Sequence, residues 1–417
     1  MKSDDLIYDN SKKILSSKIK VTSVDIWDET LRDGEQASGV HFPISGKLEI
    51  AKLLSDIGVK VIDVGMPIIS RSERKAISTI AGEGLKSDIG VTVRANKEDI
   101  RYAIDCNVDR VHLFYPTSRL HLKYKLNIPR TQEEAKSVII EMIDYIKDHG
   151  LRVDFIPEDS SRTNPEFLID LLSEIKLDLE SIMICDTVAY LLPDTTYDFT
   201  RNIIEAVGSD VLYGCHMHND LGLATANTLS AIYAGAKLPT VTVNGIGERA
   251  GNAPLEQVVA GLKRTGINSG IKTEMIKELS DLVEKTSGIL LPVNQPIVGR
   301  HAFSHESGIH VKAMLSNTQT YEPLRPEDFG RKREYVIGKH SGRDYIIKKL
   351  KEFGIELNDK QFEEFFKRIK TRRIITQRDI EAQIKEKEYF NDRFFGIPEE
   401  ELMRLIGEVL DNNHENG

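Results

Sequence analysis

Two patterns of hydrophobic residues, one typical of strands and one typical of helices, alternate along the first part of the chain. Short apolar, β-branched runs, typical of strands buried on both faces, are each followed by a segment with apolar residues at helical spacing. Lys47–Ile57, for example, has an apolar helical face and is followed by Gly58, a residue that tolerates the backbone of a helix end. The predicted strands are the stretch from Val24, Val59–Gly65, Ile89–Val93, Arg110–Phe114, Arg152–Ile156, Ser181–Cys185, Val211–Cys215 and Thr240–Val243. The predicted helices are Lys47–Ile57, Ser72–Ala81, Glu98–Cys106, Thr131–His149, Pro165–Ile175, Thr195–Val207, Thr225–Ala236 and Ala253–Thr265.

This alternation predicts an α/β fold with a parallel sheet. Eight strand–helix units in roughly 250 residues fit a (β/α)8 TIM barrel better than an open doubly wound sheet. Polar residues also follow nearly every strand, whereas an open sheet collects them at one switch point. In a barrel all strand ends converge on one mouth, so these residues could share a site: Asp33, Arg94, His112, Glu158, Thr187, His216, His218 and Asn252.

The repeat ends near Thr273, which predicts two domains. We expect residues 1–272 to form the barrel and residues 273–417 to form a mainly helical accessory region that acts as a lid or dimer contact. This region contains a histidine-rich stretch, Gly299–Leu315, and a basic loop, Pro323–Gly342, before a charged helical tail.

Composition narrows the class of protein. With 40% hydrophobic and 29% charged residues among 417, the chain can bury an ordinary core, and a net charge of −9 disfavours a general nucleic-acid binder. No apolar run approaches the roughly 18 residues of a membrane span, and the first residues lack a signal core, so we expect a cytoplasmic protein with no membrane partner. Cys106, Cys185 and Cys215 lie in apolar surroundings without a C-x-x-C pair, which predicts buried thiols.

His216-x-His218, at the end of the seventh predicted strand, is the sharpest chemical signal. Alternate side chains of a strand face the same side, so both imidazoles can bind one cation. Asp33, from the first strand end, would add an anionic oxygen. Two histidines and one carboxylate with open positions suit a divalent Zn, Mn, Co or Mg ion acting as a Lewis acid. The competing interpretations are structural histidines and, around Arg32 and Asp33, a solvated turn.

Weaker signals come from three other segments. Glu158-Asp159 is a candidate general base, although a solvated loop before Pro165 explains it about as well. His310, with His305-Glu306, could supply an acid–base pair, but loop histidines are common. Gly245-x-Gly247 and Gly251-Asn252 indicate either a tight turn or a close approach of backbone to a ligand.

Four ordered segments together resemble a known family. They are Asp28–Gln36, His216–Ala224, Asn244–Asn252 and His305–His310, and the resemblance spans about residues 24 to 345. The chain resembles the metal-dependent acyl-CoA-condensing barrel enzymes, namely the 2-isopropylmalate, homocitrate and citramalate synthases. The resemblance implies a Claisen condensation: acetyl-CoA loses a methyl proton, its methyl carbon attacks the keto carbon of a 2-oxo acid, and the thioester is hydrolysed.

The resemblance also implies a role for each matching residue. The divalent metal would be held by Asp33, His216 and His218, with Asn252 near it. Arg32 would neutralise the alkoxide, and the other catalytic residues would be Glu158 and His310, the latter offered across a homodimer. The substrate-binding residues would be Gln36, Arg94, His112 and Thr187. The residues that bind acetyl-CoA would be Gly247, Glu248 and Arg249.

The acceptor is harder to predict. Gly308–Ala313 and Thr92–Ala95 look most like homocitrate synthases, and Arg94 could pair with the second carboxylate of 2-oxoglutarate. Against this, Asp154 and Ile156 differ from lysine-pathway homocitrate synthases, and their segment reads closer to isopropylmalate synthases. Roughly 70 residues after 345 leave too little room for the leucine-sensing domain of those enzymes, so we favour 2-oxoglutarate. The alternatives are oxaloacetate (a Re-type citrate synthase), a phosphonate analogue, isopropylmalate or citramalate synthesis, a retro-Claisen lyase and a non-catalytic protein on this scaffold.

Overall fold

A computed structural model describes residues 7–15, 18–19, 21–126, 128, 130–372, 375, 377–394, 397 and 399–414. The first predicted domain begins, and the second ends, on residues outside this set. The chain groups into two compact units, Met1–Ala37 with His41–Leu291, and Ser38–Val40 with Pro292–Gly417. The predicted boundary after residue 272 precedes the boundary between these units, and the predicted lid and dimer roles stay predictions.

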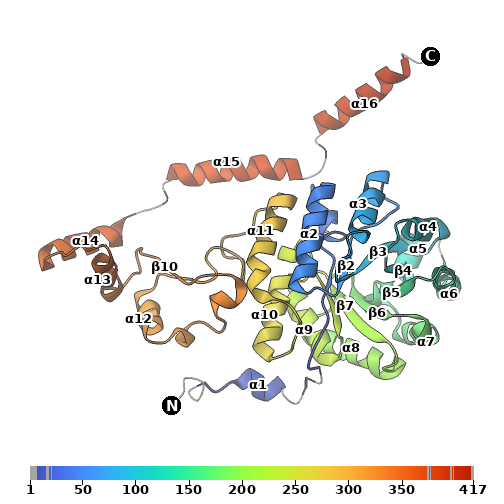
Figure 1. Cartoon of the computed structure of the whole chain (residues 1–417), viewed down its shortest axis with the longest axis horizontal. Helices are drawn as coiled ribbons and strands as arrows, with labels where there is room; N and C mark the ends of the chain where they lie inside the picture. Colours follow the sequence, from blue (N-terminus) through green and yellow to red (C-terminus); the bar gives the residue numbers. More distant parts are fainter. Residues whose placement is uncertain are drawn as a thin grey trace. The chain divides into compact units, whose positions relative to one another are not determined.

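The first unit is a closed barrel of eight parallel strands, as predicted (Figure 1). The strands are β1 (Trp27–Asp28), β2 (Val61–Asp63), β3 (Asp88–Arg94), β4 (Arg110–Pro116), β5 (Arg152–Glu158), β6 (Ser181–Asp186), β7 (Leu212–Met217) and β8 (Leu238–Val241). The short β1 closes the barrel because Trp27 is in register with Val61 on one side and with Thr240 on the other. All eight strand ends therefore open at one mouth.

Helices follow the strands and surround the barrel (Figure 1). They are α2 (Ile44–Ile57), α3 (Arg71–Ala81), α4 (Lys97–Asp105), α5 (Arg119–Tyr124), α6 (Gln132–Asp148), α7 (Pro165–Ile175), α8 (Pro193–Val207), α9 (Ala224–Ala234) and α10 (Leu255–Thr265). Local sequence explains their ends: α6 starts with a capping box of Thr131 and Glu134, and α2 ends at Gly58, whose φ is 104°. The short α5, capped by Ser118, was not predicted.

A hydrophobic cluster fills the barrel between the strands. Its buried members are Trp27, Val61, Ile156, Met183, Cys185 and Leu238. Burial of this apolar area is the main favourable term for a barrel of this kind. The three cysteines are free and buried, which confirms the prediction for them.

One helix beyond residue 272 belongs to the first unit. It is α11 (Ile276–Ser287), preceded by a 3-10 turn, η6 (Thr273–Met275). Ser280 donates a hydrogen bond from Oγ to Asn244 Oδ1 (2.6 Å) and accepts one from Asn244 Nδ2 at its carbonyl (3.0 Å). Because Asn244 lies in η5 (Val243–Gly245), directly after β8, α11 supports a loop at the mouth.

The second unit is mainly helical, as predicted. It contains α12 (Gly308–Ser316), α13 (Arg343–Glu352), α14 (Asp359–Thr371), α15 (Gln377–Phe394) and α16 (Glu399–His414). Two short strands, β9 (Ser304–His305) and β10 (Glu334–Tyr335), pair in parallel. Among the helices that the structure describes in either unit, none combines the length and apolar character of a membrane span.

Candidate active site

A cavity of about 430 Å³ opens at the carboxyl ends of the barrel strands. Its polar lining consists of Glu29, Arg32, Asp33, Gln36, Thr92, His121, Lys125, Glu158, Thr187, His216, His218, Glu248 and Arg249. Its apolar lining consists of Met66, Phe114, Ile156, Met183, Cys185 and Val188. A concave site in which polar groups converge beside an apolar wall is typical of a pocket for a small ligand.

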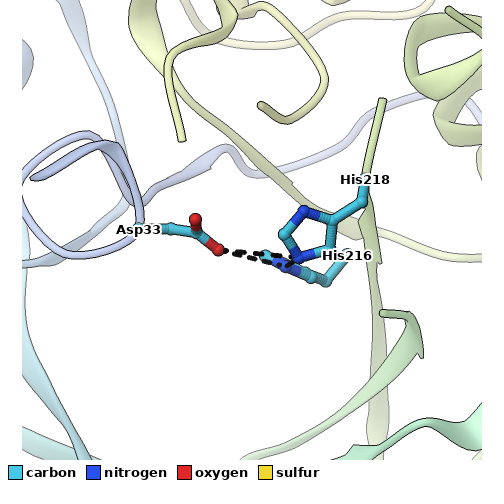
Figure 2. A group of neighbouring side chains, drawn as sticks. All are labelled: Asp33, His216 and His218. Carbon is cyan, nitrogen blue, oxygen red and sulfur yellow. Dashed lines mark hydrogen bonds and ion pairs between the residues drawn. The ribbon is translucent and has the colours of Figure 1, made fainter. Parts of the chain in front are cut away.

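Asp33, His216 and His218 come together on one side of this cavity (Figure 2). His216 Nε2 lies 3.1 Å from His218 Nε2 and 3.5 Å from Asp33 Oδ2, and His218 Nε2 lies 3.8 Å from the same oxygen. Ligand atoms about 2.0–2.2 Å from one zinc-sized ion are spaced in this way. The two imidazoles come from β7 and the residue after it, and the carboxylate comes from the turn after β1. The trio therefore fits one divalent cation.

The neighbours of His216 orient its ring for this task. Its Nδ1 lies 2.9 Å from Thr240 Oγ1 and 3.1 Å from Glu29 Oε2. A proton on Nδ1 that faces the Glu29 carboxylate leaves the lone pair of Nε2 free for a metal. Glu29 was not predicted to act here, although it lies within the charged stretch that ends the first strand.

The charges in the trio also suit a cation. Burial disfavours ionisation of Asp33, but Arg32, His216 and His218 outweigh it and lower the pKa of this carboxyl. Burial, together with His216, lowers the pKa of His218 to about 4. At neutral pH the site thus offers an anionic oxygen and, at His218, a neutral imidazole.

Asn252 is a fourth polar residue beside the trio. Its side chain is buried, and within the described residues neither its amide oxygen nor its amide nitrogen has a hydrogen-bond partner. A Cβ atom on Gly247 would lie 2.4 Å from Asn252 Nδ2 and 3.0 Å from Asp33 Oδ1. The glycine therefore permits the amide and the carboxylate to approach, and an orphaned buried amide beside three donors fits a further metal contact.

Arg32 lies between three carboxylates. Its Nε is 3.2 Å from Asp63 Oδ2, its Nη1 is 3.1 Å from Asp33 Oδ2, and Nη2 bonds to Glu29. These contacts fix the guanidinium beside the metal trio, where it can stabilise negative charge on a bound oxygen. Arg32 and Asp33 thus contact each other at the edge of the metal trio.

Glu158 ends β5 and lines the cavity. Burial opposes its ionisation, but His121 and Lys125 outweigh it and lower the pKa of the carboxyl. Lys125 forms an ion pair with Glu158, and His121 Nδ1 lies 3.8 Å from its Oε2. Both side chains lie on or next to the unpredicted α5. The signal that could have found them is Ser118, an N-cap residue directly after a strand.

The loop after β8 and the end of β6 supply the remaining predicted residues of the cavity. The backbone N–H of Glu248 donates to Asp33 Oδ1 (3.0 Å). Arg249 donates to the carbonyl of Thr187 (2.8 Å), and Thr187 Oγ1 accepts a bond from the N–H of Asp159 (2.9 Å). Gln36 also lines the cavity, with Nε2 3.8 Å from Met66 Sδ.

Gly247 and Asn252 lie beside Asp33 but are not part of the cavity lining, and three further predicted residues lie outside it. His112 is fully buried, packs against Trp27 with the rings tilted by 42° and their centroids 4.0 Å apart, and contacts Asp154 Oδ2 through Nδ1 (2.9 Å). Arg94 binds Asp99 through two contacts of 2.8 Å and is 54% exposed. His310 belongs to the second unit, where its exposed ring stacks on Tyr321 at 3.9 Å. The substrate and catalytic roles of these three residues stay predictions.

Comparisons with known proteins agree with this site. Residues 23–283 match the profile of a family described as HMGL-like, and residues 297–376 match one described as homocitrate synthase post-HMGL domain-like. A probable 2-isopropylmalate synthase of Methanopyrus kandleri is 47% identical over 83% of this chain and 69% of its own length. The (R)-citramalate synthase CimA of Methanocaldococcus jannaschii is 46% identical over 83% and 70%, and the homocitrate synthase AksA of M. kandleri is 46% identical over 83% and 86%.

Solved structures support the fold. The HMG-CoA lyase of Bacillus subtilis superimposes with a TM-score of 0.58 at 19% identity, over 65% of this chain and 96% of the lyase. The HMG-CoA lyase of Brucella melitensis gives a TM-score of 0.56 at 20% identity, over 64% and 99%. At such low identity these likenesses extend to the barrel and no further.

Proposed function

Because the chain belongs to the HMGL-like family, among the acetyl-CoA-condensing 2-oxo acid synthases, we propose that it condenses acetyl-CoA with 2-oxoglutarate to form homocitrate and CoA. The observation that carries the reaction class is the juxtaposition of Asp33, His216 and His218 with the guanidinium of Arg32 in one cavity. It joins a site for a divalent cation to a fixed positive charge.

The metal site serves the 2-oxo acid. Asp33, His216 and His218, with Asn252 beside them, would hold the divalent ion. When bound, such an ion supplies Lewis-acid polarisation of a keto oxygen. Arg32 stabilises the negative charge that develops on the same oxygen as the carbon–carbon bond forms, and Glu29 and Asp63 keep its guanidinium in place.

Glu158 is the base in this proposal. It takes a proton from the acetyl methyl group, whose carbon then bonds to the keto carbon. Its depressed pKa keeps it ionised at neutral pH, and Oε2 is buried without a hydrogen-bond partner in the described part of the chain. Water then cleaves the thioester, which releases the CoA thiol and a new carboxylate. We assign contacts with acetyl-CoA to Gly247, Glu248 and Arg249, and an acid–base role to His310 of the second subunit of a homodimer.

The choice of 2-oxoglutarate rests on sequence likeness and on charge. The relative named homocitrate synthase AksA is matched over 86% of its length, and the second family profile carries the same activity in its description. Arg94, our predicted partner for the distal carboxylate, pairs with Asp99 outside the cavity lining, whereas Lys125 pairs with Glu158 on the cavity wall. We therefore regard Lys125 as a second candidate for that contact.

An aliphatic acceptor is the second candidate function. The apolar side of the cavity, formed by Met66, Phe114, Ile156 and Met183, would favour the side chain of pyruvate or 2-oxoisovalerate over a carboxylate. Relatives named citramalate and 2-isopropylmalate synthase are about as similar to this chain as the one named homocitrate synthase.

A CoA-release assay tests the proposal. Acetyl-CoA is offered with 2-oxoglutarate, oxaloacetate, 2-oxoisovalerate or pyruvate, before and after removal of metal with a chelator. We expect the fastest release with 2-oxoglutarate, loss of activity with chelator, and recovery when Mn²⁺ or Zn²⁺ is added. Selective use of pyruvate or 2-oxoisovalerate would refute the homocitrate assignment but keep the reaction class. Full activity without metal would refute the class. Arg94→Ala and Lys125→Met then show which cation raises the KM for a dicarboxylic acceptor when it is lost.

A further inference from the structure

Lys47 is a buried cation outside the cavity lining. Its side chain lies on α2 and is 1% exposed. Burial of an ammonium group is costly unless it is paired, and here two carboxylates and one carbonyl surround it. Lys47, Glu35 and Glu73 thus form a cluster of charges next to the cavity but outside its lining.

One side of the ammonium group binds the turn that carries Arg32 and Asp33. Lys47 Nζ lies 2.5 Å from Glu35 Oε2 and donates to the carbonyl of Leu31 at 3.4 Å. Leu31 and Glu35 flank the three residues Arg32, Asp33 and Gly34. The ammonium group of Lys47 therefore binds both ends of this turn. The other carboxylate oxygen of Glu35 accepts a bond from the N–H of Phe42 (2.8 Å), which ties the turn to the start of α2.

The other side of the ammonium group binds the segment after β2. Lys47 Nζ donates to Glu73 Oε1 at 2.6 Å, in the first turn of α3. A Cβ atom on Gly65 would lie 1.9 Å from that oxygen and 3.4 Å from Lys47 Nζ. The pair therefore packs directly against the backbone of Gly65, whose φ is 133°.

Gly65 lies between two residues of the site. Asp63, two positions earlier, binds Arg32 Nε at 3.2 Å and accepts a bond from the N–H of Gly65 at 3.2 Å. Met66, the next residue, lines the cavity beside Gln36. The Lys47–Glu73 pair thus supports the backbone from which the second partner of Arg32 projects.

We propose that Lys47 is a positioning residue for the active site. Its buried ammonium group fixes the turn after β1 against the segment after β2, and so sets where Asp33 meets the two histidines and where Arg32 meets Asp63. Metal and substrate sites require their ligands within about 0.5 Å of the productive geometry, which supporting contacts of this kind provide. The inference rests on the proposed function, because it assumes that the trio holds a metal.

Three variants and a metal titration test the proposal. Lys47→Met removes the charge and keeps the length, Lys47→Arg keeps the charge, and Lys52→Met is a matched control on the same helix. Lys52 is 45% exposed and pairs with Glu83 at 2.8 Å. The dissociation constant for Mn²⁺ is measured by calorimetry without substrate, and KM and kcat follow in the CoA-release assay.

We expect Lys47→Met to weaken Mn²⁺ binding about 10- to 100-fold, the usual effect of losing a residue that orients metal ligands. It should also raise the KM for the 2-oxo acid. Lys47→Arg should restore most of the affinity, and Lys52→Met should leave both quantities unchanged. A purely structural role would lower the melting temperature but leave the metal affinity and KM of the folded protein as they are.

A fourth variant covers the case in which Lys47→Met does not fold. Glu73→Gln keeps the volume and leaves Lys47 paired with Glu35, and we expect a smaller loss of affinity in the same direction. Unchanged Mn²⁺ affinity and KM in folded Lys47→Met, or in Glu73→Gln when the former is unfolded, would overturn the proposal. If the unaltered protein binds Mn²⁺ but releases no CoA with any acceptor, the proposed function fails while the titration still judges Lys47. If the unaltered protein binds no metal, both fail.

Discussion

Asp28 is a fully buried acid in the strand that leads to the active site. Its carboxylate accepts bonds from the N–H (2.8 Å) and the hydroxyl (3.0 Å) of Thr30. Burial nevertheless raises the pKa of Asp28 to about 7, and the negative charges of Glu29 and Asp63 add to the effect. Between the unfolded pKa near 3.9 and this value, the folded protein binds one proton more than the unfolded chain. The contribution of Asp28 to stability therefore falls as pH rises through this window, by up to about 1.4 kcal/mol per pH unit.

We predict that Asp28→Asn flattens this decline. The asparagine has no proton to lose, so raising the pH from 5 to 8 should lower the free energy of unfolding of the metal-free variant less than that of the unaltered protein. Urea unfolding at several pH values measures it. Asp25→Asn, which alters an exposed carboxylate three residues earlier, is the control and should follow the unaltered protein. A variant whose pH profile equals that of the control would contradict the raised pKa.

The alternation of side chains along a strand shows which single residues the sequence could place. His216 and His218 meet one cation because alternate residues share a face, and this rule needs no structure. The same rule places His112 on the face of Phe114, and only Phe114 reaches the cavity. His112 lies two residues, roughly 6.6 Å, deeper in the barrel, in register with Asp154. Depth along a strand depends on how the barrel closes, which local sequence does not encode. Arg94 lies outside the cavity lining for a different reason, because its guanidinium pairs with Asp99 in the next helix.

At the scale of elements, the loop after β8 joins the metal site to the barrel wall. Gly247 lies where a Cβ atom would meet Asn252 Nδ2 at 2.4 Å and Asp33 Oδ1 at 3.0 Å. We predict that Gly247→Ala displaces one of these groups and weakens Mn²⁺ binding about 10- to 100-fold, while the melting temperature of the metal-free protein changes little. Calorimetric titration and a thermal melt measure the two effects.

Gly82→Ala provides the comparison for this loop. Gly82 ends α3 with a φ of −78°, which alanine adopts readily, and its added Cβ would meet the carbonyl of Ser78 at 3.3 Å. Its metal affinity should equal that of the unaltered protein. Equal affinities for both alanine variants would mean that the close approach at Gly247 has no part in metal binding.

Helices and strands could be predicted where the residues that determine them are close together in the sequence. All eight strands, and the helices between them except α5, follow from burial on two faces, helical spacing and caps such as Thr131. The helix α5 was missed because six residues hold less than two turns of periodic signal. Its absence from the prediction also hid His121 and Lys125, which shift the pKa of Glu158. Short elements at a barrel mouth therefore limit how much of a site can be predicted.

At the scale of the whole molecule, the end of the catalytic unit is open to experiment. The strand–helix pattern stops near residue 272, yet the compact unit continues to Leu291 because α11 packs against the barrel. Ile276, Leu279 and Val283 are buried on this helix, and each stabilises the fold by roughly 1.5–3 kcal/mol. The sequence pattern does not predict that this helix packs against the barrel, because the elements that it contacts, α2 and η5, lie far away in the sequence.

We predict that a fragment of residues 1–291 unfolds cooperatively and binds Mn²⁺ as tightly as the full chain, whereas a fragment of residues 1–272 is less stable by several kcal/mol. Loss of α11 also removes both bonds between Ser280 and Asn244, a residue with a φ of 63° that leads into the glycine loop of the site. The shorter fragment should therefore bind metal more weakly even where it is folded. Thermal unfolding and calorimetry compare the two fragments. Equal stability and equal affinity would place the folding boundary at residue 272, and would show that α11 only covers a barrel that is complete without it.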